Sequence, residues 1–104
     1  MTHLVQYKLK AECVAENEAF VTRVFEELKR VQPPGVRYAT FRHGDGVSFT
    51  HLVSRETPAD GVNPLTSLPT FKAFAAGIRD RCKVAPVTIE LKEIGTYGFT
   101  FFPA

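Results

Sequence analysis

The chain has 104 residues, 44% of them hydrophobic and 23% charged, which is typical of one globular domain spanning residues 1–104. The formal net charge is +2, and no basic cluster is longer than Lys29-Arg30, so the composition argues against a nucleic-acid partner. No stretch approaches the roughly 20 apolar residues of a membrane helix, and the N-terminal residues lack the pattern of a secretory signal. We therefore predict a cytoplasmic protein without membrane contact.

The residue types that most often carry metal or nucleophilic chemistry are sparse. Cys13 and Cys82 are the only cysteines and lie far apart in the sequence, so we expect reduced structural thiols. The three histidines have no metal-ligand spacing, and the sequence contains no glycine-rich phosphate loop, Ser-His-Asp order or paired carboxylates. We predict neither a metal nor a cofactor.

The first half of the chain begins with a strand and continues with a helix. Residues 3–10 alternate, with Val5, Tyr7 and Leu9 on the apolar side, which predicts a half-buried strand. Between residues 16 and 32 an apolar stripe repeats with helical spacing and contains Phe20, Val24, Leu28 and Val31. This amphipathic helix is expected to end at Pro33-Pro34-Gly35.

The second half repeats this order after a hairpin. Residues 36–42 and 47–54 flank Gly44-Asp45-Gly46 as two strands, and residues 56–64 form a loop that is a candidate lid or rim. A second helix opens near Thr66, Ser67 and Pro69, with hydroxyl groups as caps, and its apolar stripe reaches Cys82. A fourth strand follows Pro86, over residues 87–92, and an aromatic tail over residues 97–102 needs burial.

The order βαββαβ predicts an α+β fold. A ferredoxin-like antiparallel sheet with two helices on one face buries both helical stripes against a single apolar sheet face. The side chains left for the opposite face are then mainly polar: Lys8, Lys10, Thr40, Arg42, Thr50, Glu90 and Lys92.

The hairpin loop decides which side chains share a face with His51. A two-residue turn places Tyr38, Thr40 and Arg42 beside it, whereas a three-residue loop with Gly46 in the left-handed conformation places Ala39, Phe41 and His43 there. The three-residue loop gathers more apolar side chains on one face, and we favour it for that reason. In that register His51 lies deep between Phe49 and Val53, and His43 lies near the turn.

Two helical segments carry a resemblance to a known family. Phe-Val-x-x-Val-Phe-x-x-Leu at residues 20–28 and Leu-Pro-Thr-Phe-Lys-Ala-Phe-Ala-Ala-Gly at residues 68–77, in this order of elements, resemble the antibiotic biosynthesis monooxygenase (ABM) domains of the dimeric α+β barrel superfamily. The resemblance implies a homodimer formed through the sheets and a pocket between helices and sheet. It also implies oxidation of aromatic compounds without metal or flavin, as in some members.

Haem degradation, the chemistry of other members, is disfavoured by the residues present. The chain has no tryptophan, Gln6 stands where an asparagine would be expected, and the second helix contains no histidine.

His51 is the sharpest candidate for a catalytic residue, as a general base toward a phenolic substrate. The candidate substrate-binding residues are Tyr7, Phe41, His43, Phe49 and Phe74. Each also has a simpler interpretation, as a core residue or, for His43, as an exposed turn residue. Two hypotheses result: a cofactor-independent monooxygenase for a small aromatic or hydrophobic substrate, or a noncatalytic dimer that binds such a ligand or serves a stress response. A pocket beside His51 would favour the enzyme.

Overall fold

The computed structural model describes residues 1–56 and 62–102. The strands and helices appear in the predicted order, which confirms the α+β class. They are β1 (Thr2–Leu9), the short 3₁₀ helix η1 (Ala11–Cys13), α1 (Val14–Val31), β2 (Val36–Arg42), β3 (Ser48–Arg55), α2 (Pro69–Ala76), α3 (Ile78–Arg81) and β4 (Cys82–Leu91).

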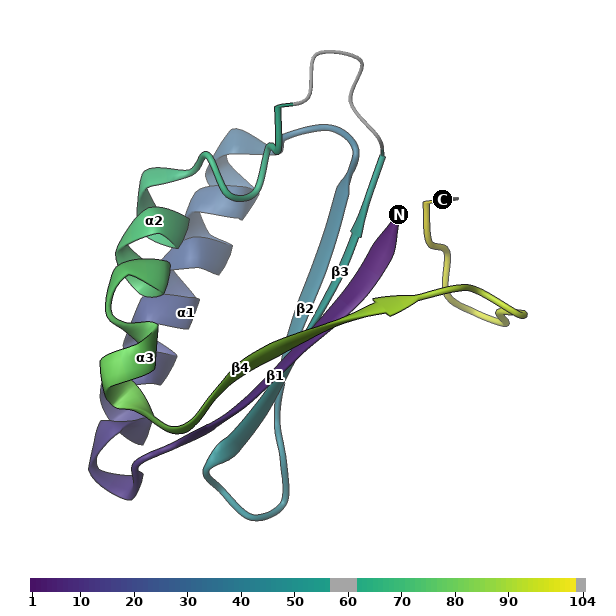
Figure 1. The fold of residues 1–104 in the computed structure, drawn as a ribbon. Helices are drawn as coiled ribbons and strands as arrows, with labels where there is room; N and C mark the ends of the chain where they lie inside the picture. The colour runs from purple at the N-terminus through teal and green to yellow at the C-terminus, as the bar shows by residue number, and fades with distance from the viewer. Residues whose placement is uncertain (57–61, 103–104) are drawn as a thin grey trace.

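The sheet is antiparallel throughout, in the strand order β2-β3-β1-β4. The connection from β1 through α1 leaves room for β3 between β1 and β2, which is the split βαβ arrangement of ferredoxin-like folds. The helices gather on one side of the sheet, and the C-terminal tail lies on the other (Figure 1). We call the sheet face away from the helices the outer face.

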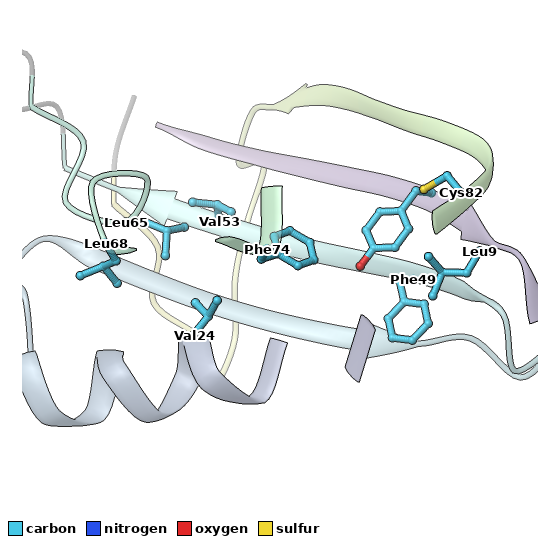
Figure 2. Close-up of a cluster of buried hydrophobic side chains, with 9 residues drawn as sticks. Leu9, Val24, Phe49, Val53, Leu65, Leu68, Phe74 and Cys82 are labelled. Atoms are coloured by element: carbon cyan, nitrogen blue, oxygen red, sulfur yellow. The ribbon is translucent and has the colours of Figure 1, made fainter. Parts of the chain in front are cut away.

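The core lies between the helices and the inner face of the sheet. Val24 of α1 and Phe74 of α2 meet Phe49 and Val53 of β3 there, and Leu65 closes one end (Figure 2). All five side chains are at most 6% exposed. Each such buried side chain stabilises the fold by about 1.5–3 kcal/mol relative to an exposed one.

The predicted second helix is interrupted. α2 ends at Ala76, α3 begins at Ile78, and Cys82 already belongs to β4 rather than to a helical stripe. The break is at Gly77, where a Cβ atom would lie 2.8 Å from Nη1 of Arg81. Arg81 thus occupies the space that a larger residue at position 77 would need.

The predicted hydroxyl caps of this helix were wrong. Leu68 is the N-cap residue and makes no side-chain cap, and Pro69 occupies the first turn as expected. A carboxylate of α1 takes the capping role: Oε1 of Glu27 accepts hydrogen bonds from the backbone N of Thr70 at 3.1 Å and from its Oγ1 at 2.6 Å. Because this contact joins α1 to α2, it fixes how the two helices lie over the sheet.

The fourth strand begins before Pro86, not after it. β4 is an edge strand, and its pairing with β1 shifts between Gln6 and Lys8, so that Val87 lies opposite Gln6 and Val84 opposite Lys8. A proline lacks the N–H group that a central strand needs but is tolerated at an edge or a bulge. Pro86 lies at such an irregularity in an edge strand, and the strand therefore continues through it.

The favoured hairpin register was also wrong. Thr40 lies opposite His51 and Arg42 opposite Phe49, which is the side-chain pairing of the two-residue alternative. The loop itself spans residues 44–47, because the backbone N of His43 donates to the carbonyl of Ser48 at 2.8 Å. Gly46 adopts the expected left-handed conformation, with φ +79°.

The outer face carries apolar as well as polar side chains, which corrects part of the expected polar face: Lys8 and Thr50 lie there as expected, but Thr40 and Arg42 do not. Thr40 and Arg42 lie on the helix side, where Arg42 forms an ion pair with Glu18 of α1 at 2.8 Å. The pairing of Leu4 with Ile89 and of Gln6 with Val87 turns the apolar side chains of β4 outward. The outer face exposes Phe41 (55%), Val84 (54%), Val87 (55%) and Ile89 (43%).

The loop predicted over residues 56–64 falls partly outside the described residues, because 57–61 are not described; its role as a lid stays a prediction. The aromatic tail is only partly covered. The backbone N of Phe102 donates to Oγ of Ser54 at 2.7 Å, and the guanidinium of Arg37 lies 4.3 Å from the Phe102 ring, whereas Tyr97 is 97% exposed. Within residues 1–56 and 62–102, no helix is long and apolar enough to cross a membrane.

Candidate functional site

A pocket of about 140 Å³ lies between the sheet and the second helical region. Most of its wall is apolar, and three polar side chains, Tyr7, Tyr38 and His51, line it as well. The apolar lining residues are Val5, Val53, Phe71, Phe74, Ala75, Ile78 and Pro86. Small-molecule sites commonly combine such an apolar wall with a few placed polar groups.

His51 lies at the centre of the polar side of this pocket and is 3% exposed. Its Nε2 is 2.7 Å from the hydroxyl of Tyr7, and its Nδ1 contacts the hydroxyl of Tyr38 and lies 3.1 Å from Oγ1 of Thr40. Burial lowers the pKa of the imidazole from 6.5 to about 4. His51 is therefore neutral at neutral pH, with one ring nitrogen carrying a proton and the other accepting one.

The hydrogen bonds continue from Tyr7 into the helices. Nδ2 of Asn17, in α1, donates to the Tyr7 hydroxyl at 2.9 Å, and Nε of Arg81 donates to Oδ1 of Asn17 at 3.1 Å. Asn17 is fully buried and Arg81 is 4% exposed. Arg81 also donates from Nη2 to the carbonyl of Phe74 at 2.7 Å.

The same guanidinium lies over an aromatic ring, 4.5 Å from the centre of Phe20. Cation–π contact and hydrogen bonds together compensate part of the cost of burying its charge.

Both tyrosines of the site keep their protons at neutral pH. Burial raises the pKa of Tyr38 to about 12 and raises that of Tyr7 further, and the hydrogen bond from Asn17 offsets only part of the effect at Tyr7. The polar side of the pocket is thus a neutral set of hydroxyl and imidazole groups, which Asn17 links to the buried cation of Arg81.

The structure brings together Tyr7, Phe49, Phe74 and His51 among the residues that the sequence pointed to. The rings of Tyr7 and Phe49 stack at 5.7 Å, and the Phe74 ring lies 5.4 Å from the imidazole. Phe49 packs behind Tyr7 and does not line the pocket itself.

Phe41 and His43 lie elsewhere. Both are on the outer face, where His43 Nε2 contacts Oγ1 of Thr50 at 2.6 Å and Phe41 is 55% exposed. The hairpin register explains the separation, because Phe41 pairs with Thr50 and not with a residue of the inner face. The two histidines of the hairpin therefore share no site.

Four polar residues of the site were missed from the sequence. Asn17 and Arg81 interrupt the apolar stripes that contain Phe20 and Ile78, and a polar residue within such a stripe was the available signal. Tyr38 and Thr40 reach His51 only in the observed hairpin register.

The described part of the chain has no group of three histidine, cysteine, aspartate or glutamate side chains that could hold a metal ion.

No protein-family model and no curated protein matches the sequence. Solved structures do match. One, an antibiotic biosynthesis monooxygenase, has a TM-score of 0.72 at 12% identity over 90% of this chain and 98% of its own. The chain has the ABM fold. A protein from Bacteroides thetaiotaomicron provisionally named an ABM gives 0.74 at 17% identity, over 97% and 94% of the two chains. SnoaB, a cofactor-independent oxygenase from Streptomyces nogalater, matches with a TM-score of 0.58 at 19% identity, over 88% of this chain and 92% of its own. At these identities the ABM likeness describes the fold alone.

Proposed function

We propose that the protein is a homodimeric, cofactor-independent monooxygenase that acts on a small aromatic or hydrophobic substrate in the pocket beside His51. The observation that carries the proposal is the pocket itself, with its apolar wall and a buried, neutral imidazole bonded only to side chains among the described contacts. The ABM fold supports it, because SnoaB, with the same fold, is a cofactor-independent oxygenase.

The size of the pocket limits the substrate. A cavity of about 150 Å³ holds one benzene ring, so a pocket of about 140 Å³ accommodates a single aromatic ring without rearrangement. Phe71 and Phe74 of α2 would contact the ring, and the hydroxyl and imidazole groups would orient its polar substituent.

The proposed reaction uses dioxygen as the oxidant. A ring hydroxyl that loses its proton makes a conjugated CH₂ group electron-rich, and that carbon then reduces dioxygen. The CH₂ group becomes a carbonyl: one oxygen atom enters the product, and the other leaves as water with both hydrogens. The protein binds and orients the substrate and keeps bulk water away from the reacting carbon.

The homodimer is proposed from the outer face. A folded monomer of this mass is expected to expose about 5,800 Å², whereas the chain exposes 6709 Å². Phe41, Val87 and Ile89 contribute apolar area on the outer face, and a patch of this kind commonly marks an interface. The occupant that we propose is a second copy of this chain.

The experiment is a measurement of dioxygen uptake with single-ring phenols that carry a conjugated CH₂ substituent. Mass spectrometry of the product with isotope-labelled dioxygen reports oxygen insertion. We expect His51→Ala to lose most of the uptake and His43→Ala, a change of the same kind on the outer face, to keep it. Unchanged turnover in His51→Ala would contradict the role of His51.

One observation favours a noncatalytic binding protein as the second candidate. Both ring nitrogens of His51 have hydrogen-bond partners within the protein, so no free base faces the pocket. Binding of the phenols without dioxygen uptake would support this function and exclude the oxygenase for the compounds tested.

A further inference from the structure

The hydrogen bonds around His51 have a direction that the residue types determine. Arginine has donors only, so the bond from Nε of Arg81 identifies the bonded atom of Asn17 as the amide oxygen. The other amide atom is then the nitrogen, which donates to the Tyr7 hydroxyl oxygen. The orientation of the Asn17 amide is therefore set by the cation.

The direction continues through Tyr7. Its oxygen accepts from Asn17, and the only other partner shown among the described residues is Nε2 of His51, so the hydroxyl proton points to Nε2. The opposite arrangement would leave the hydroxyl proton of Tyr7, a residue that is 4% exposed, without an acceptor among the described residues, which costs about 1–3 kcal/mol. Nε2 is thus an acceptor, and the proton of the neutral imidazole is on Nδ1.

Nδ1 in turn donates toward the hydroxyl oxygens of Tyr38 and Thr40. In the series Arg81, Asn17, Tyr7, His51 and Tyr38, each residue then donates its hydrogen bond to the next one. Hydrogen bonds connected in this way polarise one another. The positive charge of Arg81, where the series begins, is not neutralised by a carboxylate, since the ion pairs of the described residues are Glu27 with Arg30 and Glu18 with Arg42. The Tyr38 hydroxyl, which also has a hydrogen bond with the Thr40 side chain, therefore becomes a strengthened donor at the pocket wall, and a ligand oxygen there would replace Thr40 as its acceptor.

We propose that the pocket binds the phenolate or enolate oxygen of an aromatic ligand, with Tyr38 donating to that oxygen and with Asn17 and Arg81 as positioning residues. The inference rests on the proposed function, because it assumes that the pocket takes a ligand. In this arrangement His51 accepts a hydrogen bond from Tyr7 and donates one to Tyr38, and it takes up no proton from the ligand. The proton lost by the ligand goes to solvent. The site selects for an anionic oxygen and against an amine or another cation.

The donor-to-acceptor direction of these hydrogen bonds is testable without any ligand. Nitrogen NMR of the imidazole distinguishes the protonated from the unprotonated ring nitrogen, and we expect Nδ1 to be protonated in the unchanged protein. In Asn17→Asp the new carboxylate oxygen accepts from Tyr7, and the imidazole proton moves to Nε2. Gln32→Glu makes the same chemical change at an exposed residue at the end of α1, away from these hydrogen bonds, and should leave the imidazole signals in place.

A proton on Nε2 in the unchanged protein would overturn the inference. This NMR measurement is made on the unchanged protein, so it tests the inference even if Asn17→Asp fails to fold.

The ligand preference is tested with 4-nitrophenol, whose absorbance reports its ionisation, and with 4-nitrotoluene as a probe of similar shape without the hydroxyl. We expect the anion of 4-nitrophenol to bind at least about tenfold more tightly than its neutral form, so the pKa of the bound probe falls by one or more. Tyr38→Phe should remove this preference while retaining binding of 4-nitrotoluene.

The outcomes separate the two proposals. If neither probe binds, the pocket is not a ligand site and the proposed function fails. If both bind but the pKa of bound 4-nitrophenol is unchanged or raised, the pocket is a ligand site and the proposed preference for the anion is wrong.

Discussion

The buried imidazole of His51 makes stability depend on pH. Its pKa is about 4 in the folded protein against 6.5 in an unfolded chain, so below pH 6.5 the unfolded chain binds a proton that the folded protein does not. Acid therefore favours unfolding, and the full contribution of the neutral imidazole is present only above pH 6.5. We expect the free energy of unfolding to be about 2 kcal/mol lower at pH 5 than at pH 7 on account of His51.

Urea unfolding at both pH values measures this difference. His3, whose pKa burial also lowers, acts in the same direction, so the comparison needs variants. His51→Gln should lose most of the pH dependence between pH 5 and pH 7, and His43→Gln, outside the pocket, should retain it. Equal stability of the unchanged protein at both pH values would show that the imidazole is not desolvated.

Single polar residues of the site were hard to predict for a physical reason. Asn17 and Arg81 are buried because they satisfy each other and Tyr7, not because of their own hydropathy. Local periodicity assigns such side chains to solvent, since it contains no information on partners that lie 64 residues apart. His51 and Tyr7 were accessible to prediction because they lie on the apolar side of alternating strands.

At the scale of the element, the hairpin loop depends on one glycine. Gly46 has φ +79°, and an added Cβ would meet no atom within 4 Å, so the cost of a side chain there is backbone strain alone. We expect Gly46→Ala to lower the free energy of unfolding by about 1–2 kcal/mol. Gly44→Ala, in the same loop with open space and no positive φ, should change it by less than about 0.5 kcal/mol. Urea unfolding of both variants compares them, and equal effects would contradict the strain argument.

The hydrophobic pattern alone did not determine the register of this hairpin. The favoured register assumed that apolar residues belong to one face, and that assumption fails when both faces of a sheet carry apolar side chains. Phe41 on the outer face and Phe49 on the inner face satisfy the pattern equally well. The spans of α1 and β2 were close to those predicted because their signals are local: helical spacing, a Pro-Pro-Gly stop and β-branched or aromatic residues.

For the whole molecule, the order of elements was sufficient to predict the layers. Two helical stripes and four strands in the order βαββαβ have few arrangements that bury both stripes against one sheet face, and the observed sheet is one of them. The position of the second helix was less well predicted, because Gly77 and the edge-strand Pro86 changed where α3 ends and β4 begins. Those boundaries depend on Arg81 filling the space beside Gly77, which is a tertiary contact.

The apolar outer face leads to a prediction about assembly. If a second copy covers it, a carboxylate at Phe41 becomes buried without a partner, which costs several kcal/mol and favours the monomer. We expect Phe41→Glu to reduce the molecular mass in solution, measured by light scattering or sedimentation, from that of a dimer to that of a monomer. Because Phe41 is 55% exposed in the single chain, the variant should still fold. Ala73→Glu, on the exposed side of α2, is the matched control and should remain dimeric. A monomeric unchanged protein would contradict the proposed dimer, and a dimeric Phe41→Glu would place the interface elsewhere.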